Sequence, residues 1–356
     1  MPKQMPAIME TGDVAGALIW QADHADRNGA PATGRLIRAF LPLLNGETKV
    51  GRRMREWPGL TLEDAMPLRL AGGYHNLLLT GTDTRLAPVY AGEIRDQAEI
   101  DAIAAAIAHE HDDFLLPWFD GPPQTNEAGR SAGIMAQLMW LSQRLGPRFE
   151  LNEIGSSAGI NTMMDRFRFM LGGVEVGNAG APLLIAPKWR GSPPPDAPVD
   201  IASIRGCDLS PINLTDRAQA LRLKSYVWAD MPARLARIDA AIMLAAEKAP
   251  DVVRADAADW LIARLAQDQS AGETRVLFHS IVWQYLPAEG RERIETAMDA
   301  AGKRATAARP LAWVRVETNR QTFRHELRCR FWPGGEEEVL LGEAHAHGVW
   351  LDWYGK

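Results

Sequence analysis

Apolar residues follow a helical period along the first part of the chain. In residues 100–109 and 134–145 they recur at intervals of three and four, the spacing of one face of an α-helix. Pro and Gly interrupt this pattern at residues 57–59, 71–73 and 120–123, which predicts loops there. The pattern therefore predicts a mostly helical N-terminal domain over residues 1–146.

The pattern changes after residue 147. Short apolar runs ending near residues 154, 208, 256 and 280 alternate with helical segments, which is typical of a parallel sheet with crossover helices. A strand at 310–317 and strand-like segments at 326–332 and 339–353 follow. We therefore predict an α/β domain over residues 147–356, with a doubly wound, Rossmann-like mixed sheet. Gly and Pro are frequent in an insertion around residues 172–198, which we expect to lie over or beside the ligand cleft and outside the sheet.

Composition narrows the classes of function. The chain has 356 residues and a formal net charge of −6, and no run of Lys and Arg offers a surface for a polyanion, so we expect no nucleic-acid partner. Cys207 and Cys329 are too few for a disulfide framework, which favours the cytoplasm. Residues 1–29 resemble neither a signal peptide nor a spanning helix, so we expect no membrane association. The oligomeric state is not predicted.

The first run of the α/β domain, residues 149–154, leads into a turn of small residues. Glu153 precedes Gly155, Ser157 lies at the middle of the turn and Gly159 at its end, and a helix is predicted from about residue 160 to 170. Small residues let the backbone approach a ligand closely. Glycines at the first and fifth positions do not match the dinucleotide fingerprint, which needs the first, third and sixth. A tight turn without a ligand is the alternative.

The later runs also carry polar residues at their ends, where open α/β sheets bind ligands. Asp208, followed by Leu209, ends the second run, and Asp256, followed by Ala257, ends the third. Each carboxylate could accept hydrogen bonds from a ligand or could cap a helix. In the fourth run, His279 is a candidate general base, although a lone His is more often structural. His279 and the following Ser280 are also candidate cofactor-binding residues, and Tyr285 is a candidate substrate or pocket residue.

Together these runs resemble class I S-adenosylmethionine-dependent methyltransferases. The pattern Glu-x-Gly-x-x-x-Gly of residues 153–159 resembles the first motif of that family, in which the carboxylate approaches the methionine part of the cofactor. The resemblance implies that Asp208 binds the ribose and Asp256 the adenine, and that strands after residue 310 form an antiparallel end of the sheet. Ser157 stands where the motif usually has a glycine, and Asp208 lies farther from the turn than usual.

A polar cluster precedes the α/β domain. Gln124, Asn126 and Arg130 surround a predicted helix start, and capping explains only part of the cluster. With residues 153–161, including Asn161, and with segments 165–166, 206–209 and 278–280, it resembles an uncharacterised bacterial domain family placed among methyltransferase-like folds. We therefore treat Gln124, Asn126, Arg130 and Asn161 as candidate substrate or pocket residues.

Two functions remain open at this point. The first is a methyltransferase that uses S-adenosylmethionine as cofactor and acts on an unidentified small-molecule acceptor. The second is a non-catalytic module that binds a nucleotide or S-adenosylmethionine, with the helical domain contacting a partner. A nicotinamide oxidoreductase is disfavoured by the glycine spacing. The histidine pairs at 109/111 and 345/347 lack an evident third ligand, so no metal site is predicted.

Overall fold

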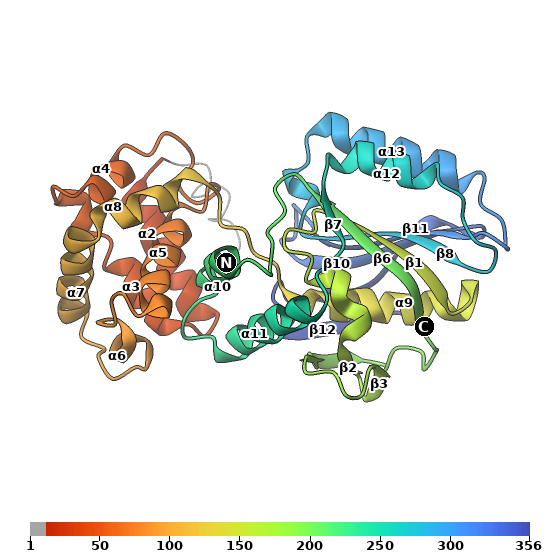
Figure 1. Cartoon of the computed structure of the whole chain (residues 1–356), viewed down its shortest axis with the longest axis horizontal. Helices are drawn as coiled ribbons and strands as arrows, with labels where there is room; N and C mark the ends of the chain where they lie inside the picture. The colour runs from red at the N-terminus through yellow and green to blue at the C-terminus, as the bar shows by residue number, and fades with distance from the viewer. Residues whose placement is uncertain (1–11) are drawn as a thin grey trace. The chain divides into compact units, whose positions relative to one another are not determined.

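The computed structural model describes residues 12–356, so the first eleven residues of the predicted N-terminal domain lie outside it. The described chain divides into two units (Figure 1): a helical unit of residues 12–125 and Asp216–Ala236, and an α/β unit of Asn126–Thr215 and Arg237–Lys356. The predicted boundary near residue 147 thus falls inside the α/β unit. The helical unit also takes a segment from the second half of the chain.

Helices of one to four turns make up most of the helical unit. They are α2 (Val14–Arg27), α3 (Pro31–Arg38), α4 (Lys49–Arg55), α5 (Met66–Thr80), α6 (Ala87–Tyr90), α7 (Gln97–Glu110), α8 (Asp112–Leu115) and α10 (Arg217–Ser225), with the 3-10 helices η1 (Pro42–Asn45) and η2 (Leu116–Asp120). Side chains cap the starts of four of them. Asp13 accepts the Gly16 N–H at α2 and Asp96 accepts the Glu99 N–H at α7, and Thr48 and Asp216 do the same at α4 and α10. Helix α11 (Pro232–Glu247) begins in this unit and continues in the other.

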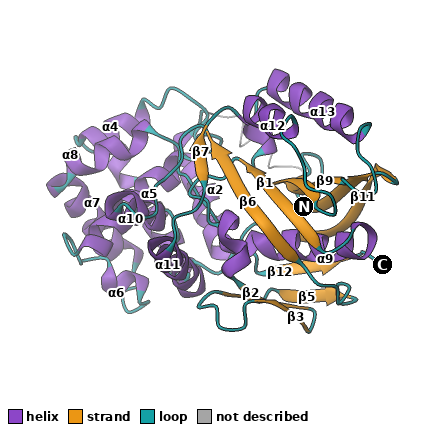
Figure 2. Cartoon of the chain, turned by 45° about the vertical axis from the view of Figure 1, so that its right-hand side comes forward, coloured by secondary structure: helices purple, strands orange, loops and turns teal. Residues whose placement is uncertain are grey.

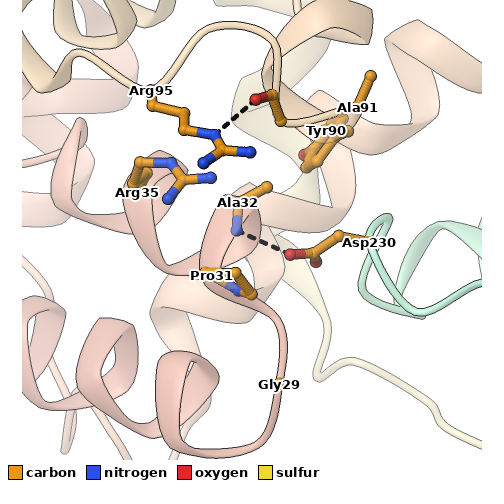
Figure 3. Close-up of a pocket in the computed structure, with 9 residues that line it drawn as sticks. Gly29, Pro31, Ala32, Arg35, Tyr90, Ala91, Arg95 and Asp230 are labelled. Carbon is orange, nitrogen blue, oxygen red and sulfur yellow. Dashed lines mark hydrogen bonds between the residues drawn. The ribbon is translucent and has the colours of Figure 1, made fainter.

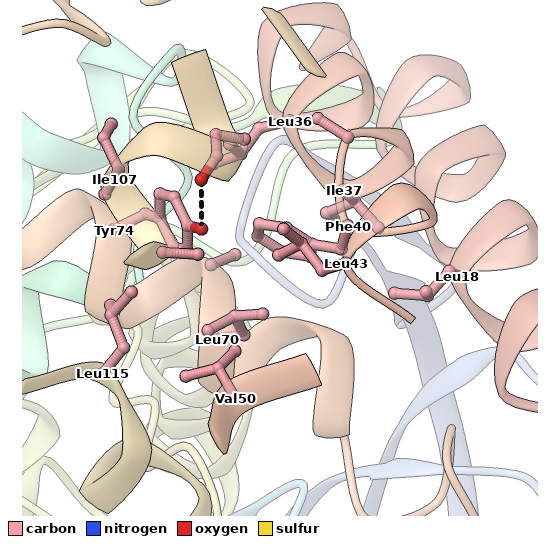
Figure 4. Packing of buried hydrophobic residues seen from close by; sticks show 14 of the residues in the cluster. Leu18, Leu36, Ile37, Phe40, Leu43, Val50, Leu70, Tyr74, Ile107 and Leu115 are labelled. Carbon is pink, nitrogen blue, oxygen red and sulfur yellow. Dashed lines mark hydrogen bonds between the residues drawn. The ribbon is translucent and has the colours of Figure 1, made fainter. Parts of the chain in front are cut away.

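Apolar side chains from α2, α3, α5 and α7 form the core of the helical unit (Figure 4). At its centre the buried Tyr74 hydroxyl donates to the Ala104 carbonyl at 2.8 Å. The predicted loop at residues 71–73 is wrong, because these residues lie inside α5. A Cβ on Gly73 would come within 2.9 Å of Leu115 and 3.0 Å of Trp118, so the glycine permits close helix packing.

A large mixed sheet dominates the α/β unit. Its strands are β1 (Arg148–Ile154), β5 (Lys188–Gly191), β6 (Asp200–Asp208), β7 (Val252–Arg254), β8 (Thr274–Ser280), β9 (Leu311–Thr318), β10 (His325–Trp332), β11 (Gly335–Ala344) and β12 (Trp350–Trp353). Within the described residues they form a nine-stranded sheet in the order β5-β12-β11-β10-β9-β8-β1-β6-β7. Strands β7, β6, β1, β8 and β9 are parallel, whereas β10, β11 and β12 each run antiparallel to the strand before.

Helices cover both faces of this sheet (Figure 1). Helix α9 (Ser131–Leu145) packs against β9 and β10, and α12 (Ala257–Leu265) and α13 (Ala288–Gly302) pack on the opposite face. The core under α12 and α13 includes Ile154, Leu277 and Trp313. The short 3-10 helices η3 (Ala128–Arg130), η4 (Asn161–Arg166) and η5 (Trp283–Tyr285) lie before α9, after β1 and after β8. The predicted α/β class is therefore correct at the level of a mixed sheet between helices.

Two details differ from the prediction. The helix expected over residues 160–170 is absent, since η4 leads directly into β2 (Arg168–Leu171). Strand β2 forms a separate three-stranded sheet with β3 (Val174–Gly177) and β4 (Leu184–Ile185), and both belong to the insertion. One part of the insertion does enter the main sheet, contrary to the prediction, because β5 pairs with β12 at its edge. Strands β1 and β6 remain direct neighbours (Figure 2).

Candidate functional site

The chain changes direction between two central strands of the α/β unit. From β1 it continues to β6 on one side, and from β8 to β9 on the other, so the loops after β1 and β8 diverge. Ligands bind at such switch points in open α/β sheets, outside the carboxyl ends of the strands. In register, Glu153 of β1 lies between Gly206 of β6 and Phe278 of β8. The predicted strand-end residues are thus brought to one edge.

Glu153 is a buried carboxyl group at this edge. Its side chain is 1% exposed, and the amide of Asn161, which is also buried, lies 3.5 Å from its Oε1. Burial raises the pKa of Glu153 to about 8, against the opposing effect of hydrogen bonds from Ser156 and Asn161. Three buried polar atoms here have no hydrogen-bond partner among the described residues: Glu153 Oε2, Ser157 Oγ and Asn161 Oδ1. Such atoms normally bond a partner, so this group is suited to a polar ligand.

The turn after β1 is held by Asp208. Ser157 has a φ of 53°, a strained conformation for a residue with a Cβ. Its N–H donates to Asp208 Oδ2 at 2.8 Å, and Asp208 Oδ1 accepts the Ser210 N–H at 2.8 Å. Asp208 therefore fixes the turn and the loop after β6. Leu209, beside it, is 67% exposed.

The glycines of the turn serve contacts within the protein. A Cβ on Gly155 would lie 2.2 Å from Val282, and one on Gly159 would lie 2.6 Å from Val252. Each glycine therefore permits close packing within the protein, and a cofactor-binding role for either remains a prediction. Both have positive φ values, which explains the residue type independently.

Asp256 caps a helix in the structure. Its Oδ1 accepts the N–H groups of Ala258 and Asp259 at 2.9 and 3.1 Å, at the start of α12. Ala257 is buried as the first residue of that helix. Asp256 therefore acts as a helix cap, as the alternative interpretation of the sequence predicted. An additional role in binding adenine remains a prediction.

His279 is a buried structural residue. Its ring is 0% exposed and stacks on Trp283 with centroids 5.3 Å apart. The Trp313 N–H donates to Nε2 at 3.0 Å, so the proton is on Nδ1, which lies 2.6 Å from Glu317 Oε1. Burial lowers the pKa of His279. With both ring nitrogens bonded to the protein, His279 has no nitrogen available as a general base, and the prediction of that role is corrected. Its cofactor-binding role remains a prediction.

Glu317, which the sequence analysis missed, organises the loop after β8. Its Oε1 also accepts the Val282 N–H at 3.0 Å, and its Oε2 accepts the Trp283 N–H at 3.3 Å. Ile281 in this loop has a φ of 52°, which is strained for a β-branched residue. Asp208 was chosen because it is a polar residue at the end of a predicted strand. The same criterion would have found Glu317, since Glu317 lies near the end of β9.

The remaining candidates differ in their positions. Asn126 Oδ1 accepts the Ile160 N–H at 2.7 Å, so it supports the turn after β1. Arg130 is 9% exposed, donates to the Ala346 carbonyl at 2.9 Å and lies close enough to Glu153 to lower its pKa. Ser280 is buried and Tyr285 is 71% exposed. Gln124 belongs to the helical unit, and its role at this edge remains a prediction.

One cluster elsewhere has metal-ligand chemistry. Among the described residues, Asp83, Glu110 and His111 of the helical unit place one ligand atom each within 4.8 Å of one another. The guanidinium of Arg85 donates hydrogen bonds to Asp83 and Glu110, so this arginine already supplies a positive charge next to the two carboxylates. No helix within residues 12–356 has both the length and the apolar character to cross a membrane.

The comparisons with known proteins identify a family. No curated protein and no solved structure matches the chain. Residues 15–353 match the model of a family described as "Uncharacterized protein conserved in bacteria (DUF2332)". This match spans both units and all strand ends described above. The chain therefore belongs to this conserved bacterial family.

Proposed function

We propose that the α/β unit is a Rossmann-like, methyltransferase-type domain that binds S-adenosylmethionine at the edge formed by β1, β6 and β8. The protein would then transfer a methyl group to a small-molecule acceptor. The observation that carries this proposal is the group of unpartnered buried atoms on Glu153, Ser157 and Asn161, beside the strand switch between β1 and β8.

The chemistry of Glu153 fits the amino-acid end of this cofactor. A buried carboxyl group without a full set of partners is costly when ionised, and a ligand ammonium group would offset that cost. Asn161 can accept a further hydrogen bond through its Oδ1. When bound, S-adenosylmethionine supplies an electrophilic methyl group on a sulfonium. The residues of this edge would bind and orient it.

The backbone of the turn argues against a dinucleotide. The N–H groups of Ser156, Ser157, Gly159 and Ile160 all have acceptors within the protein. A pyrophosphate needs free N–H groups at such a turn. S-adenosylmethionine has no phosphate, so this arrangement favours it over a nicotinamide dinucleotide.

A non-catalytic binding module is the second candidate. It is favoured by His279, whose two ring nitrogens are both bonded inside the protein and which therefore offers no base. Methyl transfer can proceed through orientation of the acceptor without a base, so both candidates remain compatible with the site.

Calorimetric titration with S-adenosylmethionine and with S-adenosylhomocysteine tests binding. We expect saturable binding of both, and a loss of about tenfold or more in affinity for Glu153→Gln, because a charge-assisted bond is lost. Glu337→Gln is the matched control, since Glu337 is exposed on β11 and distant in register from the edge. Absence of binding by the folded wild type at millimolar ligand would contradict the proposal.

A second measurement separates the two candidates. The protein is incubated with S-adenosylmethionine and a bacterial small-molecule extract, and S-adenosylhomocysteine is measured over time. If S-adenosylhomocysteine forms only when the extract is present, and is not formed by the Glu153→Gln variant, the result supports a methyltransferase. Binding without any formation supports the module.

A further inference from the structure

A pocket of about 330 Å³ lies within the helical unit, at the start of α3 and the end of α6. Figure 3 shows the side chains of Arg35, Arg95 and Asp230 around it. Its volume is at the lower end of the range for small-molecule sites. Gly29, Ala32, Ala91 and Gly92 complete much of its wall, and their small size leaves the space open.

Two guanidinium groups in this pocket have hydrogen-bond donors without acceptors. Within residues 12–356, the Arg35 guanidinium makes no hydrogen bond or ion pair, and its Nε is shielded from solvent. Arg95 is exposed at the mouth of the pocket. Its Nε donates to the Gly92 carbonyl at 2.6 Å, which orients the group, and among residues 12–356 its two terminal nitrogens have no hydrogen-bond partner. Both groups point into the pocket in Figure 3.

The single acidic residue of the pocket lining does not neutralise these charges. Asp230 Oδ2 accepts the Ala32 N–H at 2.7 Å, and its Oδ1 accepts the Thr33 hydroxyl at 2.6 Å. Both oxygens are therefore committed to the first turn of α3, whose preceding residue, Ala30, offers no side-chain cap. Among the described residues lining the pocket, the positive charge of Arg35 and Arg95 is left without a counter-charge.

This arrangement is that of an oxyanion site. Two like charges that line one pocket repel each other, and an anion bound between them would offset that repulsion. The fork of donors on a guanidinium matches the oxygens of a carboxylate or a phosphate, and a shielded Nε without an acceptor is itself unfavourable. We propose that this pocket binds a small molecule through a carboxylate or phosphate group held by Arg35 and Arg95. The site is independent of the proposed S-adenosylmethionine site.

Calorimetric titration of the full chain with inorganic phosphate and with malonate, at constant ionic strength, tests the proposal. We expect saturable binding of at least one anion, weakened about tenfold or more in Arg35→Gln and in Arg95→Gln. The matched control is Arg52→Gln, an exposed arginine of α4 outside the pocket, which should bind as the wild type does. Binding of phosphate alone indicates a phosphorylated ligand, and binding of malonate alone a carboxylated one.

A steric variant adds a test that leaves the charges unchanged. Ala91 lines the pocket, is exposed and has an ordinary helical conformation, so Ala91→Phe should fold and fill the space. We expect it to weaken anion binding with an unchanged melting curve. Wild type that binds neither anion, or arginine variants that are folded and bind as tightly as the wild type, would overturn the proposal.

Discussion

The carboxylate of Asp208, at the end of β6, accepts the Ser157 N–H at 2.8 Å and so ties this strand to the turn after β1. The same carboxylate accepts the Ser210 N–H through its other oxygen. Residues about fifty positions apart in sequence are thereby joined beside the unpartnered atoms of Glu153 and Asn161. The shape of the proposed cofactor site therefore depends on this carboxylate, whether or not Asp208 also contacts the ribose.

Asp208→Asn should destabilise the α/β unit by about 1–3 kcal/mol, because one acceptor oxygen becomes an NH2 group facing an N–H donor. Affinity for S-adenosylhomocysteine should fall as well, since the turn loses its support. Asp256→Asn is the control: Asp256 caps α12 with one oxygen only, and Asn ranks with Asp at helix starts. Thermal unfolding of both variants checks this, and equal losses would contradict it.

The free energy of unfolding should fall as the pH rises from about 4.5 to about 8, because of Glu153. Its pKa is raised from the ordinary 4.5 to about 8 by burial, so across this window the unfolded chain has lost a proton that the folded protein keeps. Below the window Glu153 is protonated in both states, and above it ionised in both. Glu153→Gln removes this decline. Urea unfolding at several pH values between 4.5 and 8 measures the free energy of unfolding of both proteins. The difference between variant and wild type should become smaller toward pH 4.5. If the two proteins showed parallel dependences on pH, this explanation would be excluded.

Glu150→Gln should cost about 3–5 kcal/mol, because it leaves two buried guanidinium groups without a charge partner. Glu150 lies 2.6 Å from Arg264 and 3.0 Å from Arg275, and all three are less than a tenth exposed. The exposed pair of Arg148 and Asp200 provides the control, with an expected cost below about 1 kcal/mol for Asp200→Asn. Chemical denaturation of the two variants measures both values. Similar costs would show that burial does not decide the effect.

His279→Phe should lower stability with little effect on cofactor affinity. The phenyl ring keeps the stacking on Trp283 but leaves the Trp313 N–H and the Glu317 carboxylate without their imidazole partner, a cost of about 1–3 kcal/mol. Unfolding curves and titration with S-adenosylhomocysteine measure the two effects. A variant of unchanged stability that had lost methyl transfer would instead restore the base role for His279.

Local patterns in the sequence determined the strands and the edge at which their polar ends meet. The run at residues 149–154 corresponds to β1, and those ending in Asp208 and His279 correspond to β6 and β8. Burial of parallel strands favours apolar residues, as in Val276, Leu277 and Phe278 of β8, and the carboxyl ends of such strands share one edge. These constraints act over a few residues, so a single sequence reveals them. A helix cap such as Asp256 can also be predicted from the sequence, because it bonds to N–H groups only two or three residues away.

The tertiary structure decided which of these residues are available to a ligand. His279 is occupied by Glu317 and Trp313, and Gly155 faces Val282, although nothing near either residue in sequence indicates this. Residues 216–236 join the helical unit, where Asp230 caps α3 and leaves Arg35 without a counter-charge. The physical reason is that burial and hydrogen-bond partners are set by side chains far apart along the chain, whereas helical and strand periods are set by near neighbours.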